Sequence, residues 1–322
     1  MNLLNMPTVS VWITTYNHEQ FIAKAIESVL MQNTNFDFEI IIGEDCSKDK
    51  TREIVVSYKN KYPGKIRLFL PEKNLGCNEM FYATYPLCAG KYIAWLDGDD
   101  YWIDPYKLQK QFDFMELNKN ISFCFHKVIV VNTVENSIQD SLDPYRDDDE
   151  TLNFEHFLGE TNPVNTPSVF HRNILGKQLP DWFYELPLAD LGFYFLLLAH
   201  GKAFYSTESL AAYCIHHEGA WSGSSIFQQH HQLATFNQII KPHLPAVFDK
   251  QIDSFICFHC SMLFEVNFRN GKYREALNNF RQMKKYNFRG LGQRKLWIGK
   301  MIIKIILKPV LRKKQDSYLN PN

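Results

Sequence analysis

Apolar and polar residues alternate along the first third of the chain with two different periods. Apolar runs typical of buried strands are found at Thr8–Tyr16, Phe38–Asp45, Lys65–Leu70 and Lys91–Asp97. Segments with apolar residues at helical spacing lie between them, at Gln20–Gln32, Lys50–Lys61 and Asn78–Cys88. Strands that alternate with helices of this length predict right-handed crossovers and an α/β fold, with a mainly parallel sheet flanked by helices.

The pattern is mixed after Asn118. We expect a strand at Ser122–Val131, a polar, acidic surface loop at Gln139–Glu150, a short strand at Thr166–Arg172, an apolar helix at Leu188–Lys202 and strand pieces with loop at Ala203–Gly223. Helices follow from about Phe227. The chain therefore divides into an α/β domain over residues 1–225, a helical extension over 226–290 and a basic amphipathic tail over 291–322.

Composition is that of a globular protein. The 322 residues are 45% hydrophobic and 15% aromatic, enough for a sizeable core. Seven cysteines form no paired framework, and the residues before Thr8 lack the pattern of a signal peptide, so we expect a cytoplasmic protein. Cys257 and Cys260 have a spacing that metal ligands could use, but buried helix cysteines are the favoured interpretation.

Charge is unevenly distributed, although the formal net charge is zero. Residues 276–315 hold 12 Lys or Arg and no Asp or Glu, which leaves 23 basic and 35 acidic residues, a formal charge of −12, in the rest of the chain. Zero net charge argues against a whole-protein nucleic-acid surface, and we expect no nucleic-acid partner.

The basic segment Lys295–Lys314 has helical spacing, with Lys300, Lys304 and Lys308 on one stripe and isoleucines opposite. Lysine at every fourth position excludes a membrane span. Two alternatives remain: an interfacial helix with Trp297 in the headgroup region of an anionic membrane, or a helix docked on the protein itself. The first would place a cytoplasmic protein peripherally on the inner face of the cell membrane.

Polar residues gather where the predicted strands end. Three segments lie at the carboxyl ends of predicted strands: Thr14–Asn17, Glu44–Ser47 and Asp97–Asp100. Because carboxyl ends of parallel strands meet at one edge of a sheet, where ligands collect, these segments should share a cleft. The sequence has no G-x-G-x-x-G after the first strand and no G-x-x-x-x-G-K-[ST], so a nucleotide would be held without either glycine-rich loop.

The stretch YIAWLDGDDYW, Tyr92–Trp102, brings Asp97, Asp99 and Asp100 together where an apolar strand ends. At an effective dielectric of about 20, two such charges about 4 Å apart repel each other by on the order of 4 kcal/mol. A divalent cation offsets that repulsion, and Mg²⁺ or Mn²⁺ suits carboxylates combined with phosphate oxygens and water. The alternative is a solvated acidic turn, because Asp and Gly are also turn formers.

Several motifs occur in order over about 210 residues: TTYNH (Thr14–His18), GEDCSKDKT (Gly43–Thr51), NLG (Asn74–Gly76), AGKYIAWLDGDDYW (Ala89–Trp102), Asp190 ahead of its apolar helix, and YCIHHEGAWS (Tyr213–Ser222). Together they resemble family-2 glycosyltransferases of the GT-A fold, in particular bacterial enzymes that build capsular or lipopolysaccharide glycans. The resemblance implies a Rossmann-like domain with a nucleotide-binding half at about 1–120, an acceptor half at about 121–225 and a C-terminal helical extension.

The resemblance also implies a role for individual residues. It assigns the general base to Asp190 and a divalent cation, Mg²⁺ or Mn²⁺, to Asp99 and His216. It assigns the nucleotide and donor sugar to Thr14, Tyr16, Asp45, Asn74, Asp97 and Asp100, with Asp100 in a supporting position. The implied reaction is an inverting, metal-dependent transfer of a sugar from a nucleoside diphosphate, with a UDP-sugar expected, to a hydroxyl of a surface glycan or lipid-linked oligosaccharide.

Elementary chemistry agrees with these roles. A divalent ion neutralises a leaving diphosphate, and a carboxylate near the acceptor hydroxyl can take its proton. One base opposite the leaving group gives direct displacement, which inverts the anomeric carbon. Each role also has a purely structural alternative: Asp190 could cap its helix, Thr14 and Tyr16 could be ordinary strand residues, and His216 could be polar surface.

Three sites depart from the family pattern. Glu44 replaces an aspartate, Phe81 and Tyr82 replace an Arg-Asn pair, and Cys214 replaces an arginine, changes that could alter donor contacts. We interpret Glu44 itself as a surface or capping carboxylate. Two competing functions are a sugar nucleotidyltransferase, disfavoured by the missing glycine-rich loop, and a non-catalytic glycan-binding or scaffold protein, disfavoured by the retained aspartates.

Overall fold

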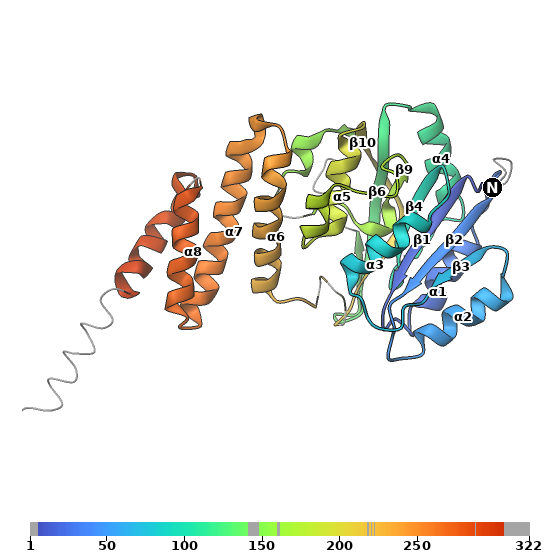
Figure 1. Ribbon diagram of the computed structural model, residues 1–322, viewed down its shortest axis with the longest axis horizontal. Coiled ribbons are helices and arrows are strands. Elements are labelled where there is room, and N and C mark those ends of the chain that lie inside the picture. The colour runs from blue at the N-terminus through green and yellow to red at the C-terminus, as the bar shows by residue number, and fades with distance from the viewer. Residues whose placement is uncertain are drawn as a thin grey trace, which may run out of the picture. The chain divides into compact units, whose positions relative to one another are not determined.

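The structure is a computed structural model and describes residues 6–140, 148–159, 162–217, 219, 221, 223–286 and 288–305 (Figure 1). The chain divides into two compact units. Unit 1 comprises Met1–Phe157 and Asn162–Gly223, and unit 2 comprises Leu158–Thr161 and Ser224–Asn322. The first is an α/β unit and the second is helical.

The described part of unit 1 is built on a sheet in which ten strands take part, with the main order β3-β2-β1-β4-β9-β6-β10-β5 and with β7 on β6 and β8 on β10. The strands are β1 Val9–Thr15, β2 Phe38–Glu44, β3 Ile66–Phe69, β4 Tyr92–Asp97, β5 Tyr101–Trp102, β6 Ile121–Asn132, β7 Ser137–Asp140, β8 Glu150–Leu152, β9 Phe170–Arg172 and β10 Lys202–Ile215.

The first four strands form the parallel half of the sheet that the sequence predicts. β1 pairs in parallel with both β2 and β4, and β2 pairs in parallel with β3. β9 then joins β4 to β6 in antiparallel orientation, while β6 and β10 are parallel over ten residue pairs with a register shift between Ser206 and Ala211. The predicted α/β class with a mainly parallel sheet and flanking helices is confirmed.

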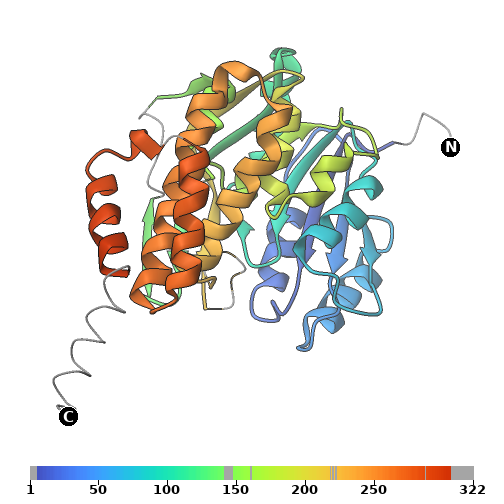
Figure 2. The ribbon, with the colours of Figure 1, turned by 60° about the vertical axis from the view of Figure 1, so that its left-hand side comes forward.

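Helices cover both faces of this sheet (Figure 1 and Figure 2). On one face, apolar residues of α1 (Ile22–Leu30), α2 (Thr51–Lys61) and α4 (Lys107–Leu117) join alternate residues of β1 in one core cluster. On the other face, Trp12 stacks on Trp95 at 4.6 Å and meets Phe81 at 4.8 Å. Phe81 belongs to α3 (Cys77–Thr84), and α5 (Ala189–Leu198) packs on the same side through Phe193. Because successive side chains of β1 point to opposite faces of the sheet, β1 contributes to the hydrophobic core on each face.

Several local expectations differ from the structure. No helix was predicted at α4, although Leu108, Phe112 and Met115 have helical spacing there. Thr166–Ser168 forms a 3₁₀ turn, so only Phe170–Arg172 is a strand. The strand pieces expected after Gly201 are one long strand, β10, because its irregular stretch is absorbed as a bulge. Within the expected acidic loop, residues 141–147 lie outside the described residues.

Unit 2 contains α6 (Ile226–Ile240), α7 (Asp249–Arg269) and α8 (Tyr273–Lys285), followed by helical residues over 294–305. A capping box starts α6, where the Ser225 hydroxyl accepts the Gln228 N–H at 3.3 Å and the Gln228 amide oxygen accepts the Ser225 N–H at 2.9 Å. Cys257 and Cys260 are buried along α7. None of the helices within the described ranges has the length and hydropathy needed to span a bilayer.

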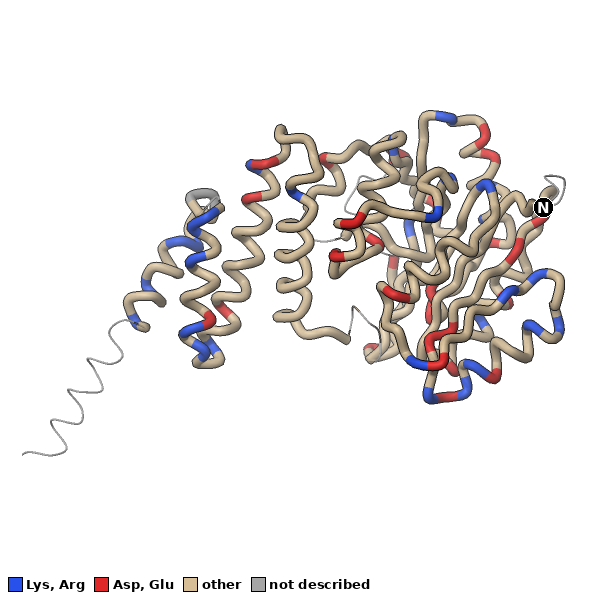
Figure 3. The backbone as a smooth tube through the Cα atoms, viewed as in Figure 1, with Lys and Arg blue, Asp and Glu red and all other residues tan. Residues whose placement is uncertain are grey.

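The predicted amphipathic tail is described only as far as residue 305. Trp297 meets the rings of Phe264 and Phe268 on α7, and Ile298 is fully buried. The indole of Trp297 therefore packs within unit 2, as the docked-helix alternative expects, and a membrane contact of the tail stays a prediction. Lysines 295, 300 and 304 are exposed, and Figure 3 shows Lys and Arg along α8 and the segment after it. The remainder of Lys295–Lys314 lies outside the described residues.

Candidate active site

The ends of β1, β2 and β4 meet at one edge of the sheet, as the parallel order predicts. The Asp45 N–H donates to the Thr15 carbonyl at 3.0 Å, and the Gly98 N–H donates to the Thr14 carbonyl at 2.8 Å. The Thr14 hydroxyl also donates to Oδ1 of Asp97 at 3.2 Å. These contacts bring the predicted donor residues of β1, β2 and β4 together, and Tyr16 follows directly at the end of β1.

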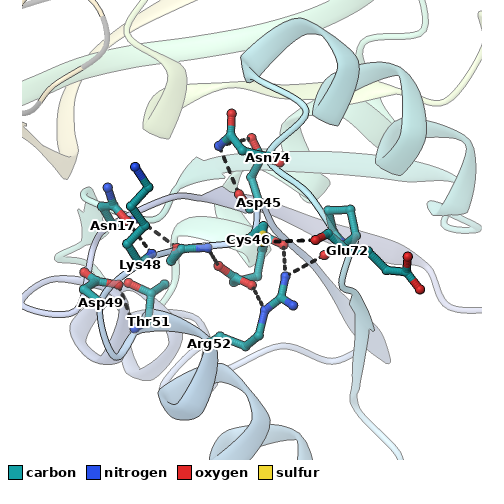
Figure 4. Close-up of polar contacts among 12 residues, drawn as sticks. Asn17, Asp45, Cys46, Lys48, Asp49, Thr51, Arg52, Glu72 and Asn74 are labelled. Carbon is teal, nitrogen blue, oxygen red and sulfur yellow. Dashed lines mark hydrogen bonds and ion pairs between the residues drawn. The ribbon is translucent and has the colours of Figure 1, made fainter.

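Asp45 holds the turn at Asn74–Gly76 through its side chain (Figure 4). Its carboxylate accepts the Leu75 N–H at 2.7 Å, the Gly76 N–H at 2.8 Å and the Asn74 side-chain amide at 3.0 Å. Gly76 has a φ of 85°, which favours glycine. Asp45 thereby fixes the start of α3, and a nucleotide contact by Asp45 or Asn74 stays a prediction.

Glu44 is fully buried, so its interpretation as a surface carboxylate is wrong. It forms an ion pair with Arg52 and accepts the Ser47 N–H at 2.7 Å. Arg52 (labelled in Figure 4) also donates to the Pro71 carbonyl at 2.9 Å, which ties α2 to the loop after β3. The longer glutamate reaches an arginine on α2 instead of facing the cleft.

The loop Asp97–Asp100 is constrained by packing and by hydrogen bonds. A Cβ on Gly98 would lie 2.4 Å from Oγ1 of Thr15, so only glycine fits there. Oδ1 of Asp100 accepts the Cys214 N–H at 2.8 Å, which ties the loop to β10. Oδ2 of Asp100 is buried without a hydrogen-bond partner among the described residues. An unpartnered buried carboxylate oxygen is the kind of atom that a nearby cation or proton stabilises.

The three neighbouring aspartates of this loop differ in their proton affinity. Burial, with the charge of Asp99 as the second cause, raises the pKa of Asp97 to about 7. Burial raises the pKa of Asp100 well above its ordinary value, and the charges of Asp99 and Asp97 add to that effect. Burial acts in the same direction on Asp99, but a hydrogen bond from His216 and the charge of His18 hold the pKa of Asp99 below its ordinary value. Asp99 is therefore the loop carboxylate best able to carry a negative charge.

Asp99 lies between two histidines. Its Oδ2 is 2.9 Å from Nε2 of His216 and 3.6 Å from Nε2 of His18. The three ligand atoms lie within 4.8 Å of one another, and theirs is the one set of at least three His, Cys, Asp or Glu side chains that could hold a metal ion among the described residues. Carboxylate oxygen and imidazole nitrogen are common ligands of divalent ions, so the predicted pair Asp99 and His216 fits the implied cation.

Sequence reasoning missed His18 as part of this cluster. The residue belongs to the motif TTYNH, which pointed to the donor side of the cleft, but no role was expected for its imidazole. The signal that could have found it is position, because His18 follows a strand whose carboxyl end borders Asp97 and Gly98. A pocket of about 470 Å³ opens beside the cluster, with Asn17, Phe21 and His216 in its lining.

Asp190 lies in the first turn of α5, and no side-chain cap is formed at the preceding Leu188. The Asn162 side-chain amide donates to Oδ2 of Asp190 at 2.7 Å. Burial raises the pKa of Asp190, against the effect of the hydrogen bonds it accepts. Its charge in turn contributes to the raised pKa of Asp97, so both carboxylates belong to one electrostatic cluster.

The other three residues that depart from the family pattern, Phe81, Tyr82 and Cys214, pack within unit 1. Phe81 is buried and contacts the rings of Trp95, Phe183 and Phe193. The Tyr82 hydroxyl donates to the Phe183 carbonyl at 3.2 Å. Cys214 is buried, and the contact it makes to Asp100 comes from its main chain. Apolar packing therefore occupies these positions in place of charged side chains.

Fold and site together define an α/β protein with a carboxylate and histidine cluster at the carboxyl edge of its parallel strands. The sequence profile of glycosyl transferase family 2 matches residues 10–179, and the chain belongs to this family. The matched residues form a glycosyltransferase domain with the GT-A fold, which confirms the family, fold and enzyme class that the motifs indicate.

Curated relatives include an uncharacterized protein of Mycobacterium tuberculosis that is 31% identical over 220 residues, 66% of this chain and 60% of that protein. The chain thus spans about 60% of the length of the mycobacterial relatives it matches. The Escherichia coli enzyme WfgD, a UDP-Glc:alpha-D-GlcNAc-diphosphoundecaprenol beta-1,3-glucosyltransferase, is 35% identical over 124 residues, 38% of this chain and 47% of that enzyme.

Solved structures share the fold at low sequence identity. Staphylococcus aureus TarS 1–349 in complex with UDP-GlcNAc has a TM-score of 0.58 at 19% identity and covers 84% of this chain and 79% of that one. The mannosyltransferase PcManGT from Pyrobaculum calidifontis, in complex with GDP-Man and Mn²⁺, has a TM-score of 0.53 at 12% identity. The match covers 95% of this chain and 88% of that one.

Proposed function

We propose that this glycosyltransferase is an inverting, metal-dependent enzyme that uses a UDP-sugar and a hydroxyl of a surface glycan or lipid-linked oligosaccharide. The proposal rests chiefly on the contact of Asp99 with His216 at 2.9 Å, beside the carboxylate of Asp97, whose pKa is raised by burial and in part by the charge of Asp190. Metal-binding and base functions need such groups in one cleft, in different protonation states.

The donor half of the site is formed by the ends of β1, β2 and β4. Tyr16 and Asp45 are proposed to border the base, and Thr14 and Asp97 the ribose and sugar. Asp45 and Asn74 already share a hydrogen bond of 3.0 Å, so they would act on the nucleotide as one preformed unit. Such preformed contacts lower the entropy lost when a ligand binds.

Asp99 and His216 are the residues that would hold a divalent cation. When bound, the cation would neutralise the leaving diphosphate as a Lewis acid. Asp100 would position these two ligands. It accepts the Cys214 N–H, which holds the loop that carries Asp99 against β10, and β10 ends one residue before His216.

Asp190 is proposed as the general base. Burial raises its pKa, so its ionised form is a stronger base than an exposed aspartate. The Asn162 side-chain amide donates to Oδ2 at 2.7 Å and so orients the carboxylate that would take the acceptor proton. The acceptor oxygen then forms a bond to the anomeric carbon of the donor sugar, while the bond between that carbon and the diphosphate oxygen breaks. This displacement inverts the configuration of the anomeric carbon.

The donor and acceptor classes are drawn from relatives by analogy. WfgD is named for UDP-Glc and a diphosphoundecaprenol-linked acceptor, and TarS was solved with UDP-GlcNAc. Exposed lysines 295, 300 and 304 in unit 2 are compatible with a peripheral position on an anionic membrane, where a lipid-linked acceptor would be met. A location on the cytoplasmic face belongs to the same proposal.

The test is transfer from a panel of nucleotide sugars, with and without EDTA, by wild type, Asp190→Asn and Asp99→Asn. We expect Asp190→Asn to lower kcat by about 100- to 10,000-fold, while donor binding measured by calorimetry is retained. Asp99→Asn should instead weaken metal-dependent donor binding. The matched control is Asp181→Asn, at an exposed position before α5. Undiminished turnover in Asp190→Asn would exclude the assigned base.

A further inference from the structure

We propose that His18 is a third protein ligand of the divalent cation and that it makes this site prefer Mn²⁺ to Mg²⁺. This inference rests on the proposed metal-dependent transfer and adds to it a ligand and an ion preference. It is carried by the position of the imidazole, by the contacts that fix it and by the chemistry of the resulting ligand set.

The distances between the three ligand atoms are close to those between neighbouring ligands of one bound ion. Nε2 of His216 and Nε2 of His18 lie 2.9 and 3.6 Å from the same Asp99 oxygen. Neighbouring ligands of an octahedral ion with bonds of about 2.1 Å are about 3 Å apart. All three ligand atoms lie within 4.8 Å of one another, so only small side-chain shifts would bring them into one coordination sphere.

The His18 imidazole is held in place from its other side. Its Nδ1 lies 3.2 Å from the Thr15 hydroxyl, and its ring makes an edge contact with Phe21 at 6.3 Å. A second hydrogen bond to Nδ1 is the usual way in which proteins orient a ligating histidine. Nε2 is therefore the nitrogen turned toward Asp99.

The backbone around His18 is fixed as well. The His18 N–H donates to the Thr51 hydroxyl at 2.8 Å, and Asn17 just before it has a φ of 53°. A Cβ on Gly98 would lie 3.0 Å from Nδ1 of His18, so the glycine keeps the space that the imidazole occupies. Loop, glycine and hydroxyl together preorganise one rotamer, which lowers the entropy lost on ion binding.

The ligand chemistry decides the preferred ion. Two imidazoles and one carboxylate offer two nitrogen ligands, whereas Mg²⁺ prefers oxygen ligands throughout. Mn²⁺ accepts both kinds of ligand and also suits the phosphate oxygens that a donor would add. A site with only Asp99 and His216 would offer one nitrogen, so His18 is the residue that shifts the preference.

The experiment is Mn²⁺ and Mg²⁺ binding to nucleotide-free protein, followed by calorimetry and by the Mn²⁺ electron paramagnetic resonance signal. Wild type, His18→Ala and His18→Asp are compared with His217→Ala, a control at the exposed neighbouring histidine. We expect His18→Ala to weaken Mn²⁺ binding by roughly 10-fold or more. His18→Asp, which offers an oxygen ligand in place of the imidazole nitrogen, should move the preference toward Mg²⁺. Circular dichroism verifies that each variant is folded.

The outcomes separate this inference from the proposed function. If transfer requires a metal and wild type binds Mn²⁺, but His18→Ala and His18→Asp bind both ions as wild type does, His18 is not a ligand and the proposed function stands. Wild type that prefers Mg²⁺ overturns the inference in the same way. If transfer proceeds in EDTA and no ion binds, the metal-dependent function fails, and the inference fails with it.

Discussion

Replacement of Asp97 by asparagine should stabilise the metal-free protein, by an amount that grows with pH. Burial raises the pKa of Asp97 from 3.8 to about 7. The folded state then holds this proton more tightly than the unfolded chain does. The stability linked to Asp97 is full below pH 4 and is lost as pH rises through 7.

The magnitude follows from the shift. Each pKa unit corresponds to about 1.4 kcal/mol. Relative to a group that stays neutral in both states, Asp97 lowers the free energy of unfolding by about 2 kcal/mol at pH 5, where only the unfolded chain has lost the proton, and by about 4 kcal/mol at pH 8, where the folded protein has lost it too. Asparagine carries no charge and keeps an oxygen that can accept the Thr14 hydroxyl. If the substitution also weakens this hydrogen bond, the free energy of unfolding falls by the same amount at pH 5 and at pH 8. The stabilisation by Asp97→Asn should therefore be about 2 to 3 kcal/mol larger at pH 8 than at pH 5.

The assay is urea unfolding in EDTA at pH 5 and pH 8, followed by tryptophan fluorescence. Five of the six tryptophans belong to unit 1, so the signal reports the unit that contains Asp97. Asp113→Asn is the matched control, since its carboxylate is exposed on α4. A stabilisation that is equal at both pH values, or that falls at pH 8, would refute the reasoning that burial and neighbouring charge set the protonation of Asp97.

Two further predictions concern other parts of the chain. Arg52→Ala leaves the buried Glu44 without its ion-pair partner, so we expect a loss of about 3 kcal/mol in the free energy of unfolding. The control Arg67→Ala removes the more exposed pair with Glu39 and should cost less than about 1 kcal/mol. Equal losses in the two variants would contradict the prediction. Deletion of residues 306–322 removes Lys308, Arg312, Lys313 and Lys314 but keeps buried Ile298, and should weaken sedimentation with anionic but not neutral vesicles. Undiminished sedimentation would exclude a membrane role for that segment.

The sequence determined the parallel half of the sheet and the location of its polar edge. Apolar runs and helical spacing are local properties, so β1 to β4 were predicted close to their observed bounds. Strands joined by right-handed crossovers run parallel, so their carboxyl ends lie at one edge, which brings Thr14, Asp45 and Asp97 together. The motifs then identified the family, because their joint order is specific even where each one is common.

Only the tertiary structure decided which side chains share the site. Asp99 and His216 are 117 positions apart, and their contact depends on how β10 pairs with β5 and β6. The pairing of β1 with β4 brought His18 toward Asp99, and the packing of α2 beside β2 buried Glu44 against Arg52. Local patterns cannot specify such contacts, because a side chain's burial and partners depend on elements far along the chain. The ligands of the candidate metal site were therefore partly visible in the sequence, and their arrangement was visible only in the fold.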